Sequence, residues 1–222
     1  MSTVAVCAQD WSLLGSLNWD WTQNLYAHVD AGYLYQQDTT FNYSASNGSS
    51  TTSSSGNISL DPGVRGDIIA GYNFNRSWAV EFNTGLLWNS SENSTLGVSL
   101  NTYTVPILVN VLYNIPLKGP WSSFVGIGGG GAATTLTYTY NPTSYTMSDS
   151  DFVFGYQAKA GLRYRFSQNA SIDIAYEFLG TTDPRWQSTQ TFSGPIPPPT
   201  TYQFQEKGFY THSLVISFTW NF

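Results

Sequence analysis

The strongest constraint on the fold is an alternation of apolar and polar side chains at every second residue. The clearest case is the segment 152–166, FVFGYQAKAGLRYRF, in which every second residue from Phe152 to Phe166 is aromatic, aliphatic or alanine. The residues between them include Gln157, Lys159 and Arg163. Successive side chains of an extended strand point to opposite sides, so this period indicates a strand with two chemically different faces.

The same period recurs in eight segments and predicts eight strands. They span residues 24–38, 64–74, 78–89, 97–113, 121–140, 152–166, 171–180 and 206–222. The fifth segment contains the run GIGGGGAATT, in which the alternation loses its phase, so the facing of that strand stays open.

Composition limits the class of protein that could contain such strands. Only 10% of residues are charged and 16% are aromatic, whereas charged residues make up about 25% of an ordinary globular domain. The sequence contains no run of about 20 apolar residues, which a membrane helix would need. The formal net charge of -6 argues against a nucleic-acid partner. Cys7 is the single cysteine, which excludes an intramolecular disulfide and a thiolate metal cluster.

Residues 1–23 are predicted to be an N-terminal segment outside the strands. The stretch VCAQD at 6–10 has small residues placed as at the end of a cleaved export signal, and a disordered start is the alternative. Val6 is bulky where lipid attachment at Cys7 would need a small residue.

The positions of the charges separate two kinds of β-protein. When the more apolar side of each strand is taken as one face, no charge falls on it inside a strand. The other face carries Asp30, Arg65, Asp67, Glu81, Lys159, Arg163, Arg165, Asp173 and Glu177. In a soluble sandwich or a lipocalin-like barrel these charges would face water and need no balance. In a membrane barrel they lie inside, where buried ions must be paired. Five acids against four bases therefore favour the barrel, with these nine residues as an ionic network in its lumen.

The connections between the strands point the same way. Links after the second, fourth and sixth strands are short, whereas those after the first, fifth and seventh are long and polar. The loop 37–61 contains SNGSSTTSSSGN, which cannot bury a core, and the loop 181–205 contains GPIPPPT. Short turns at one end and long loops at the other are typical of outer-membrane barrels.

The short turns also set a register. Three-residue turns at 75–77 and 168–170 keep the apolar residues of both joined strands on the same side of the sheet. They also place Gly71 opposite Glu81 and Arg165 opposite Asp173. Aromatic residues gather beside these turns as one interfacial girdle: Tyr72, Phe74, Trp78, Tyr113, Tyr164, Phe166, Trp220 and Phe222.

These patterns predict an all-β fold, an eight-stranded antiparallel up-and-down transmembrane barrel over residues 24–222. Lipid leaves no water for an unpaired strand edge, so the last strand must pair with the first. This requirement explains why the chain closes on the apolar alternation SLVISFTWNF.

The segments GYQAKAGLRYRF and NASIDIAYEF, together with YTVPILVNVLYNIP and THSLVISFTWNF, resemble the eight-stranded outer-membrane barrels of the OmpA, OmpX, OmpW and Opa kind. The resemblance implies a bacterial outer-membrane location and contact with lipopolysaccharide. It also implies a C-terminal signal for the barrel-assembly machinery, formed by Leu214, Ile216, Phe218, Trp220 and Phe222. We expect no peptidoglycan-binding domain after the barrel, which departs from the two-domain OmpA plan.

Three functions remain open at this point. Side chains fill the interior of an eight-stranded barrel, which favours a structural or surface-interaction protein whose loops meet an extracellular ligand. A conduit for small hydrophobic compounds is the alternative that the OmpW resemblance implies, and a lipid-modifying enzyme is the third.

No catalytic residue, metal site or cofactor is predicted. His212 and Ser213 are adjacent in a strand and point to opposite faces, so they cannot act as base and nucleophile from this spacing. His28 is predicted to lie in the lumen near Asp30, and no GxSxG or HExxH motif occurs.

The loop end is predicted to be acidic. It carries Arg185 and Lys207 against Asp38, Asp61, Glu92, Asp149, Asp151, Asp183 and Glu206. Such a rim would need divalent cations to approach lipopolysaccharide, or would attract a cationic partner.

Overall fold

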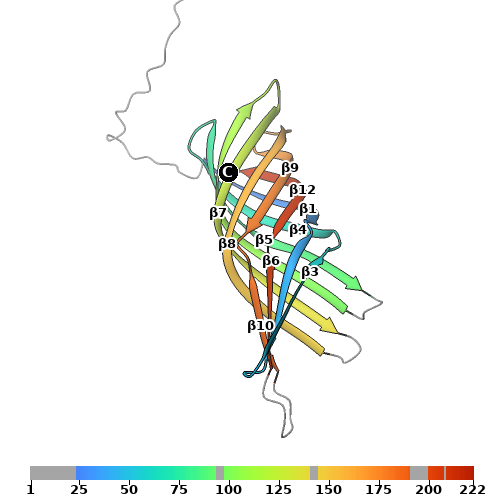
Figure 1. Cartoon of the computed structure of the whole chain (residues 1–222). Helices are drawn as coiled ribbons and strands as arrows, with labels where there is room; N and C mark the ends of the chain where they lie inside the picture. Colours follow the sequence, from blue (N-terminus) through green and yellow to red (C-terminus); the bar gives the residue numbers. More distant parts are fainter. Residues whose placement is uncertain (1–23, 94–97, 141–144, 191–199, 208) are drawn as a thin grey trace, which may run out of the picture.

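The computed structural model describes residues 24–93, 98–140, 145–190, 200–207 and 209–222, so the predicted N-terminal segment 1–23 lies outside the described residues. Eight antiparallel strands close a barrel in the order β1-β12-β9-β8-β7-β6-β5-β4 (Figure 1). Their bounds are β1 Leu25–Gln36, β4 Gly63–Asn73, β5 Trp78–Asn93, β6 Val98–Pro116, β7 Trp121–Tyr140, β8 Tyr145–Arg165, β9 Ala170–Thr181 and β12 Tyr210–Asn221. In these ranges no helix is long and apolar enough to cross a membrane.

The predicted pairing of the last strand with the first is confirmed. β1 and β12 pair from Tyr26 opposite Asn221 to Gln36 opposite Thr211. The backbone N–H of Phe222 also donates to the carbonyl of Leu25 at 3.1 Å. The C-terminal residues therefore complete the wall of the barrel.

Two short turns set the register at one end of the barrel, where the C-terminus also lies (Figure 1). Asn75 Oδ1 accepts the backbone N–H groups of Ser77 and Trp78, which fixes the predicted turn and places Gly71 opposite Glu81. The second turn begins one residue earlier than predicted, because Ser167 Oγ accepts the N–H groups of Asn169 and Ala170.

That earlier start corrects the predicted ion pair. Moving a turn by one residue moves the opposing partner by two, so Arg163 lies opposite Asp173. Arg165 lies opposite Ser171 and is exposed at the turn end. The predicted pair of Arg165 with Asp173, and the place of Arg165 in the lumen network, are therefore wrong.

The loop end contains a second sheet that the sequence did not predict. β2 Thr39–Ser46, β3 Thr51–Ile58, β10 Arg185–Gln190 and β11 Thr200–Lys207 form it in the order β10-β11-β2-β3. The predicted loops 37–61 and 181–205 contain most of these strands. The strand predicted over 206–222 is not continuous. Its first residues belong to the end of β11 in the second sheet, and most of the rest forms β12 of the barrel.

The barrel wall is longer on one side than a membrane-spanning strand requires. β6, β7 and β8 contain 19, 20 and 21 residues, whereas about 9–11 residues suffice for a membrane strand. β7 and β8 pair up to Tyr140 opposite Tyr145, so the long loop predicted after the fifth strand is instead a hairpin. This extended wall stands beside the second sheet (Figure 1).

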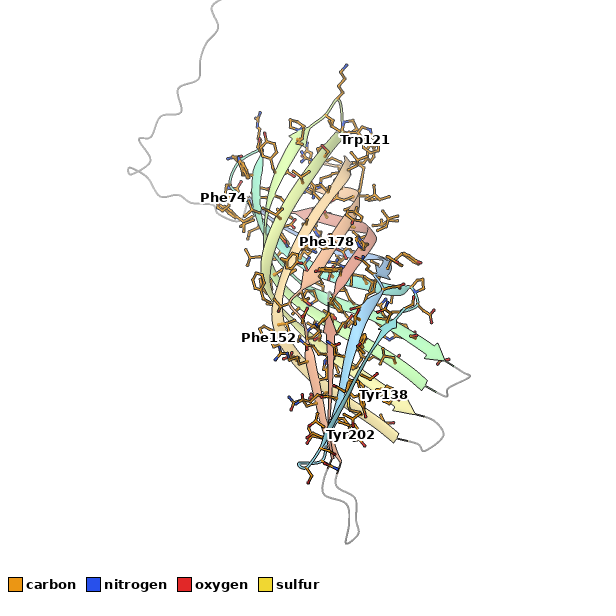
Figure 2. All side chains as sticks on the ribbon, viewed as in Figure 1. Phe74, Trp121, Tyr138, Phe152, Phe178 and Tyr202 are labelled. Carbon is orange, nitrogen blue, oxygen red and sulfur yellow. The ribbon has the colours of Figure 1, made fainter. Side chains whose placement is uncertain are left out.

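The outward face of the barrel is apolar. Side chains such as Val29, Ile68, Ile127 and Ile216 are 53–71% exposed there. The predicted girdle appears as ring pairs near the short turns, including Trp78 with Tyr113 at 4.9 Å. Trp121, which was missed because the facing of its strand was left open, packs on Tyr164 at 4.8 Å between ring centroids. Figure 2 shows Phe74 and Trp121 at the turn end and Tyr202 at the far end of the molecule.

The glycine-rich strand β7 has a defined facing. Gly128 points inward, where a Cβ atom would lie 2.1 Å from Asn110 Oδ1. Gly131 points outward, where a Cβ atom would lie 2.0 Å from the ring of Phe152. Neighbouring side chains lie across these glycines on both faces, which explains why a hydrophobic period is missing from this strand.

Candidate functional site

The lumen is filled by charged side chains in contact with one another. Eight of the nine predicted residues line it: Asp30, Arg65, Asp67, Glu81, Lys159, Arg163, Asp173 and Glu177. They hold five acids and three bases, and they form three groups along the barrel.

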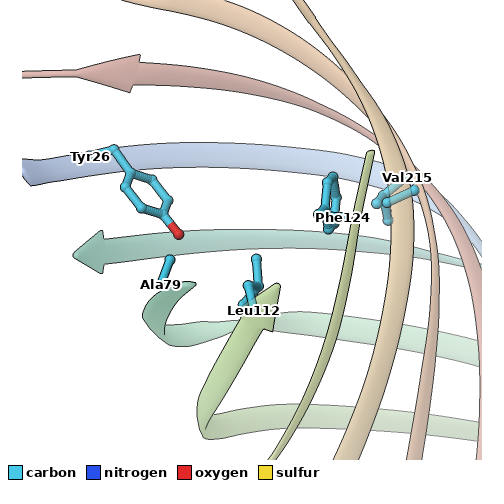
Figure 3. Packing of buried hydrophobic residues seen from close by; sticks show 6 residues of the cluster. Tyr26, Ala79, Leu112, Phe124 and Val215 are labelled. Carbon is cyan, nitrogen blue, oxygen red and sulfur yellow. The ribbon is translucent and has the colours of Figure 1, made fainter. Parts of the chain in front are cut away.

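The first group surrounds Glu81, which is fully buried. Lys159 Nζ forms an ion pair with Glu81 Oε2, and the hydroxyl of Tyr26 donates to Glu81 Oε1 at 2.8 Å. His28 Nδ1 lies 3.9 Å from Glu81 Oε1, and its ring stacks on Tyr26. The predicted inward position of His28 is confirmed. The ring of Tyr26 lies over Gly71 of the neighbouring strand β4, and its hydroxyl points toward Ala79 (Figure 3).

The second group surrounds Arg65. Its Nε lies 2.5 Å from Asp67 Oδ2, and its Nη2 lies 2.6 Å from Glu177 Oε2. Gln157 Nε2 donates to Glu177 Oε2 at 2.9 Å. Asp30 Oδ1 accepts the backbone N–H of Asp67 at 3.1 Å. One guanidinium therefore links carboxylates from two non-adjacent strands of the wall.

The third group is the corrected pair near the short turns. Arg163 Nε and Nη2 donate to Asp173 Oδ1 and Oδ2 at 2.9 and 2.7 Å, a bidentate geometry that planar guanidinium groups favour. The Arg163 guanidinium lies 5.3 Å from the centre of the Phe124 ring, and Thr219 Oγ1 donates to Asp173 Oδ2 at 3.2 Å.

An apolar layer follows the ionic groups on the loop side. Leu34, Leu87, Leu108 and Leu179 form one cluster, and each is at most 1% exposed. They come from β1, β5, β6 and β9, so the cluster spans the lumen from wall to wall. We call this cluster the leucine layer. It separates the ionic groups from the loop end.

Above the leucine layer lies a second apolar core. Leu100, Leu136 and Met147 of the extended wall pack with Phe41, Leu60 and Trp186. Trp186 is fully buried, stacks on Phe41 and donates its indole N–H to the Thr134 carbonyl at 3.1 Å. The second sheet and this part of the wall thus form a folded unit, which we call the surface lobe. Phe41 and Leu60 of the predicted loop 37–61 belong to this core, whereas the stretch SNGSSTTSSSGN at 46–57 contributes no buried side chain to it, as predicted.

Several acids of the predicted rim hold the surface lobe together. Asp151 and Asp149 of β8 accept the backbone N–H groups of Arg185 and Gln187 at 2.8 and 2.7 Å. These carboxylates replace a neighbouring strand along the free edge of β10. Asp38, Asp61 and Glu92 are exposed, as a rim requires.

Glu206 was predicted to lie on the exposed rim, but its side chain is buried in the lobe. It is fully buried in β11, and its Oε1 accepts Gln36 Nε2 at 2.7 Å. Burial, reinforced by the charge of Asp183, raises the pKa of Glu206 to about 8, against the opposing effect of the hydrogen bond from Gln36.

The histidine of the outer face contacts a tyrosine and not the adjacent serine. His212 Nδ1 lies 2.6 Å from the Tyr176 hydroxyl on the outer face, whereas Ser213 is buried on the inner face. The predicted opposite facing of His212 and Ser213 is confirmed. Across the described ranges, no group of three His, Cys, Asp or Glu side chains is arranged to hold a metal ion.

The C-terminal row lies on the outward, apolar face of the barrel. Its five side chains are 45–63% exposed: Leu214, Ile216, Phe218, Trp220 and Phe222. The row is therefore accessible from the membrane, and its role as an assembly signal remains a prediction.

A family model described as the outer membrane protein beta-barrel domain matches residues 26–222. The chain belongs to this outer-membrane barrel family. Its place is therefore the bacterial outer membrane, which it crosses with strands. In this family the short turns face the periplasm, so the surface lobe lies on the outer side of the membrane.

Solved structures share the fold at low sequence identity. The chain is 12% identical to Neisserial surface protein A, with a TM-score of 0.52 and coverage of 90% of this chain and 97% of that one. It is 9% identical to OprG from Pseudomonas aeruginosa, with a TM-score of 0.57 and coverage of 89% and 96%. The outer membrane protease OmpT from Escherichia coli is 7% identical, with a TM-score of 0.51 and coverage of 90% and 97%. No curated protein sequence matches the chain significantly.

Proposed function

We propose that this protein is a surface-interaction protein whose closed barrel anchors the surface lobe outside the membrane. The observation that carries the proposal is that the barrel lumen and the surface lobe have separate, filled cores, one above the other. Ion pairs and the leucine layer fill the lumen, and a separate apolar core supports the lobe above it. A filled lumen suits an anchor, and a folded lobe suits recognition by a rigid surface.

The conduit for hydrophobic compounds is the alternative. Transport along the barrel axis would have to displace Leu34, Leu87, Leu108 and Leu179, whose burial argues against an open path among the described residues. We also propose no catalytic role, because His212 pairs with Tyr176 on the outer face and not with Ser213, which is buried on the inner face.

The remaining partners are part of the proposal. Exposed Asp38, Asp61 and Glu92 would approach lipopolysaccharide through divalent cations, and the C-terminal row ending at Phe222 would be read by the barrel-assembly machinery.

The test compares conduction with capture. Purified protein in a planar bilayer should give no steady conductance, and the same protein in nanodiscs should capture a macromolecule from the cell exterior. A Trp186→Ala variant should lose capture because it loses the lobe core, whereas Trp88→Ala on the lipid face should keep it. Steady conductance, or capture that persists in Trp186→Ala, would contradict the proposal.

A further inference from the structure

The two faces of the second sheet differ in composition. Trp186, Phe204 and Phe41 belong to the inner face and pack toward the barrel wall. The opposite side, which we call the polar face, carries amides, hydroxyls and two cations: Thr40, Asn42, Ser44, Ser46, Ser53, Ser55, Arg185, Gln187, Gln203, Gln205 and Lys207.

Strand register arranges these side chains in rows. Arg185, Gln205, Asn42 and Ser55 lie side by side across the four strands. The next row contains Gln187, Gln203, Ser44 and Ser53. Neighbouring strands are about 4.8 Å apart, and residues on one face repeat about every 6.8 Å along a strand. The polar face is therefore a regular lattice of hydrogen-bonding groups.

The lattice lines a hollow surface. One hollow of about 620 Å³ involves Asn42, Gln203 and Arg185, and a second of about 620 Å³ reaches the β2–β3 turn at Gly48. Both include Ser44 and Gln203, so they form one continuous trough along the sheet. A trough that runs along strands suits an extended chain as its occupant.

The chemistry of the lattice selects the class of ligand. Amides and hydroxyls each donate and accept hydrogen bonds, which matches a chain of sugar hydroxyls. Among its described residues the lattice has no apolar side chain for a hydrophobic peptide, because Trp186 and Phe204, which also border the hollow, pack on the inner face. Two cations in a protein of net charge -6 are too few for a nucleic acid.

Charge is segregated on this sheet. Among the described residues of the polar face there are exposed Arg185 and Lys207 and no carboxylate, although the chain has 14 acids against 8 Lys and Arg. The nearby acids Asp149 and Asp151 lie at the β10 edge and accept backbone N–H groups. A guanidinium favours carboxylate, sulfate or phosphate groups.

We propose that the polar face binds an acidic polysaccharide from outside the cell. The sugar hydroxyls would meet the amides and hydroxyls of Asn42, Ser44 and Gln203, and an acidic group would meet Arg185. This inference rests on the proposed surface-interaction function and assigns its ligand class.

The experiment uses the full chain in nanodiscs free of lipopolysaccharide, with carboxymethyl-dextran, neutral dextran and poly-glutamate as probes. We expect carboxymethyl-dextran to bind, neutral dextran to bind more weakly, and poly-glutamate to bind least because it lacks hydroxyls. Gln203→Glu should weaken carboxymethyl-dextran binding about tenfold, because it places a like charge in the trough.

Ser148→Glu is the matched control. Ser148 is also exposed on a strand, but it lies on β8 of the extended wall, where it pairs with Thr137. The Ser148→Glu variant adds the same charge to the lobe outside the trough, so carboxymethyl-dextran binding should not change.

Three results would overturn the inference. They are equal binding by Gln203→Glu and the parent, equal binding of poly-glutamate and carboxymethyl-dextran, and self-association of the chain in sedimentation without polysaccharide binding. If another macromolecule is captured through the lobe while no polysaccharide binds, the ligand class is wrong and the surface-interaction function stands.

Discussion

The barrel buries its charged side chains and turns large apolar ones outward, whereas the surface lobe buries its aromatic side chains, although strands with the same two-residue period build both. In the barrel, Glu81 and Arg65 lie inside and Ile68 faces lipid. In the lobe, Trp186 and Phe41 lie inside and Gln203 faces outward. Lipid surrounds the barrel, so its apolar face points outward. Water surrounds the lobe, so its apolar face points inward. A strand such as β7 crosses this boundary, and its inward residues change from Gly126 and Gly128 to Leu136 along its length.

Removing Trp186 should give the largest effect and should separate the two regions. Trp186→Ala leaves a cavity in the lobe core and should cost about 3–5 kcal/mol there. Hydrogen exchange by mass spectrometry should show lost protection in β2, β10 and β11, with the barrel strands unchanged. Trp88→Ala is the control, since Trp88 is partly exposed on the lipid face. Equal loss of protection in the barrel would mean that the two regions fold as one unit.

In the lumen, the stability lost on substitution should depend on whether an ion pair is broken, not on the volume of the side chain removed. Arg163→Ala leaves Asp173 buried without its cation and should cost about 3 kcal/mol, whereas adding Asp173→Ala should restore part of the loss. A double-mutant cycle in urea with lipid vesicles measures this coupling. Arg165→Ala in the same strand should change little, because Arg165 is exposed. Additive single effects would show that Arg163 and Asp173 act independently.

Glu206 should make the stability of the lobe depend on pH. Its pKa is raised in the folded state, so folding favours the protonated form, and the stability present below about pH 4.5 declines as pH rises through about 8. The decline should be roughly 1.4 kcal/mol per pH unit within this window.

Limited proteolysis of the lobe across this pH range measures the decline. Glu206→Gln keeps the hydrogen-bonding partner for Gln36 without a charge, so its lobe should remain equally resistant from pH 5 to 8. A parent lobe with a flat profile would contradict this role of Glu206.

Removing Phe222 should have the smallest effect on the finished protein. Its side chain is 63% exposed and faces lipid, so the folded barrel should lose little stability. If the C-terminal row is an assembly signal, insertion into membranes should fall strongly. The heat-modifiable fraction is measured in cell membranes and after refolding in detergent, and an equal decrease in both would argue against a signal.

The barrel could be predicted from sequence because its pattern is local. Alternation marks each strand, and an ion on the wrong face would be costly, so Asp30 and Lys159 could be assigned to the lumen without knowing the pairing. The pair of Arg163 with Asp173 was missed because it depends on which serine or asparagine begins a three-residue turn. Ser167 makes two side-chain hydrogen bonds that fix this choice.

The surface lobe could not be predicted in the same way because its core comes from distant parts of the chain. Phe41 and Trp186 are isolated among polar residues, and each becomes buried only against Leu100, Leu136 and Met147. One signal was available. The alternation in β6 to β8 continues well past the length that a membrane requires, and inward apolar residues in that extension need a cover.

The leucine layer has a consequence for how such a protein can change over time. Leu34, Leu87, Leu108 and Leu179 isolate the buried charges below from the hydrogen bonds above. A residue exchanged in the trough of the second sheet therefore makes no contact with Arg65 or Glu81. The barrel can stay constant as an inherited platform while the lobe diversifies above it, so selection can act on recognition without endangering membrane insertion.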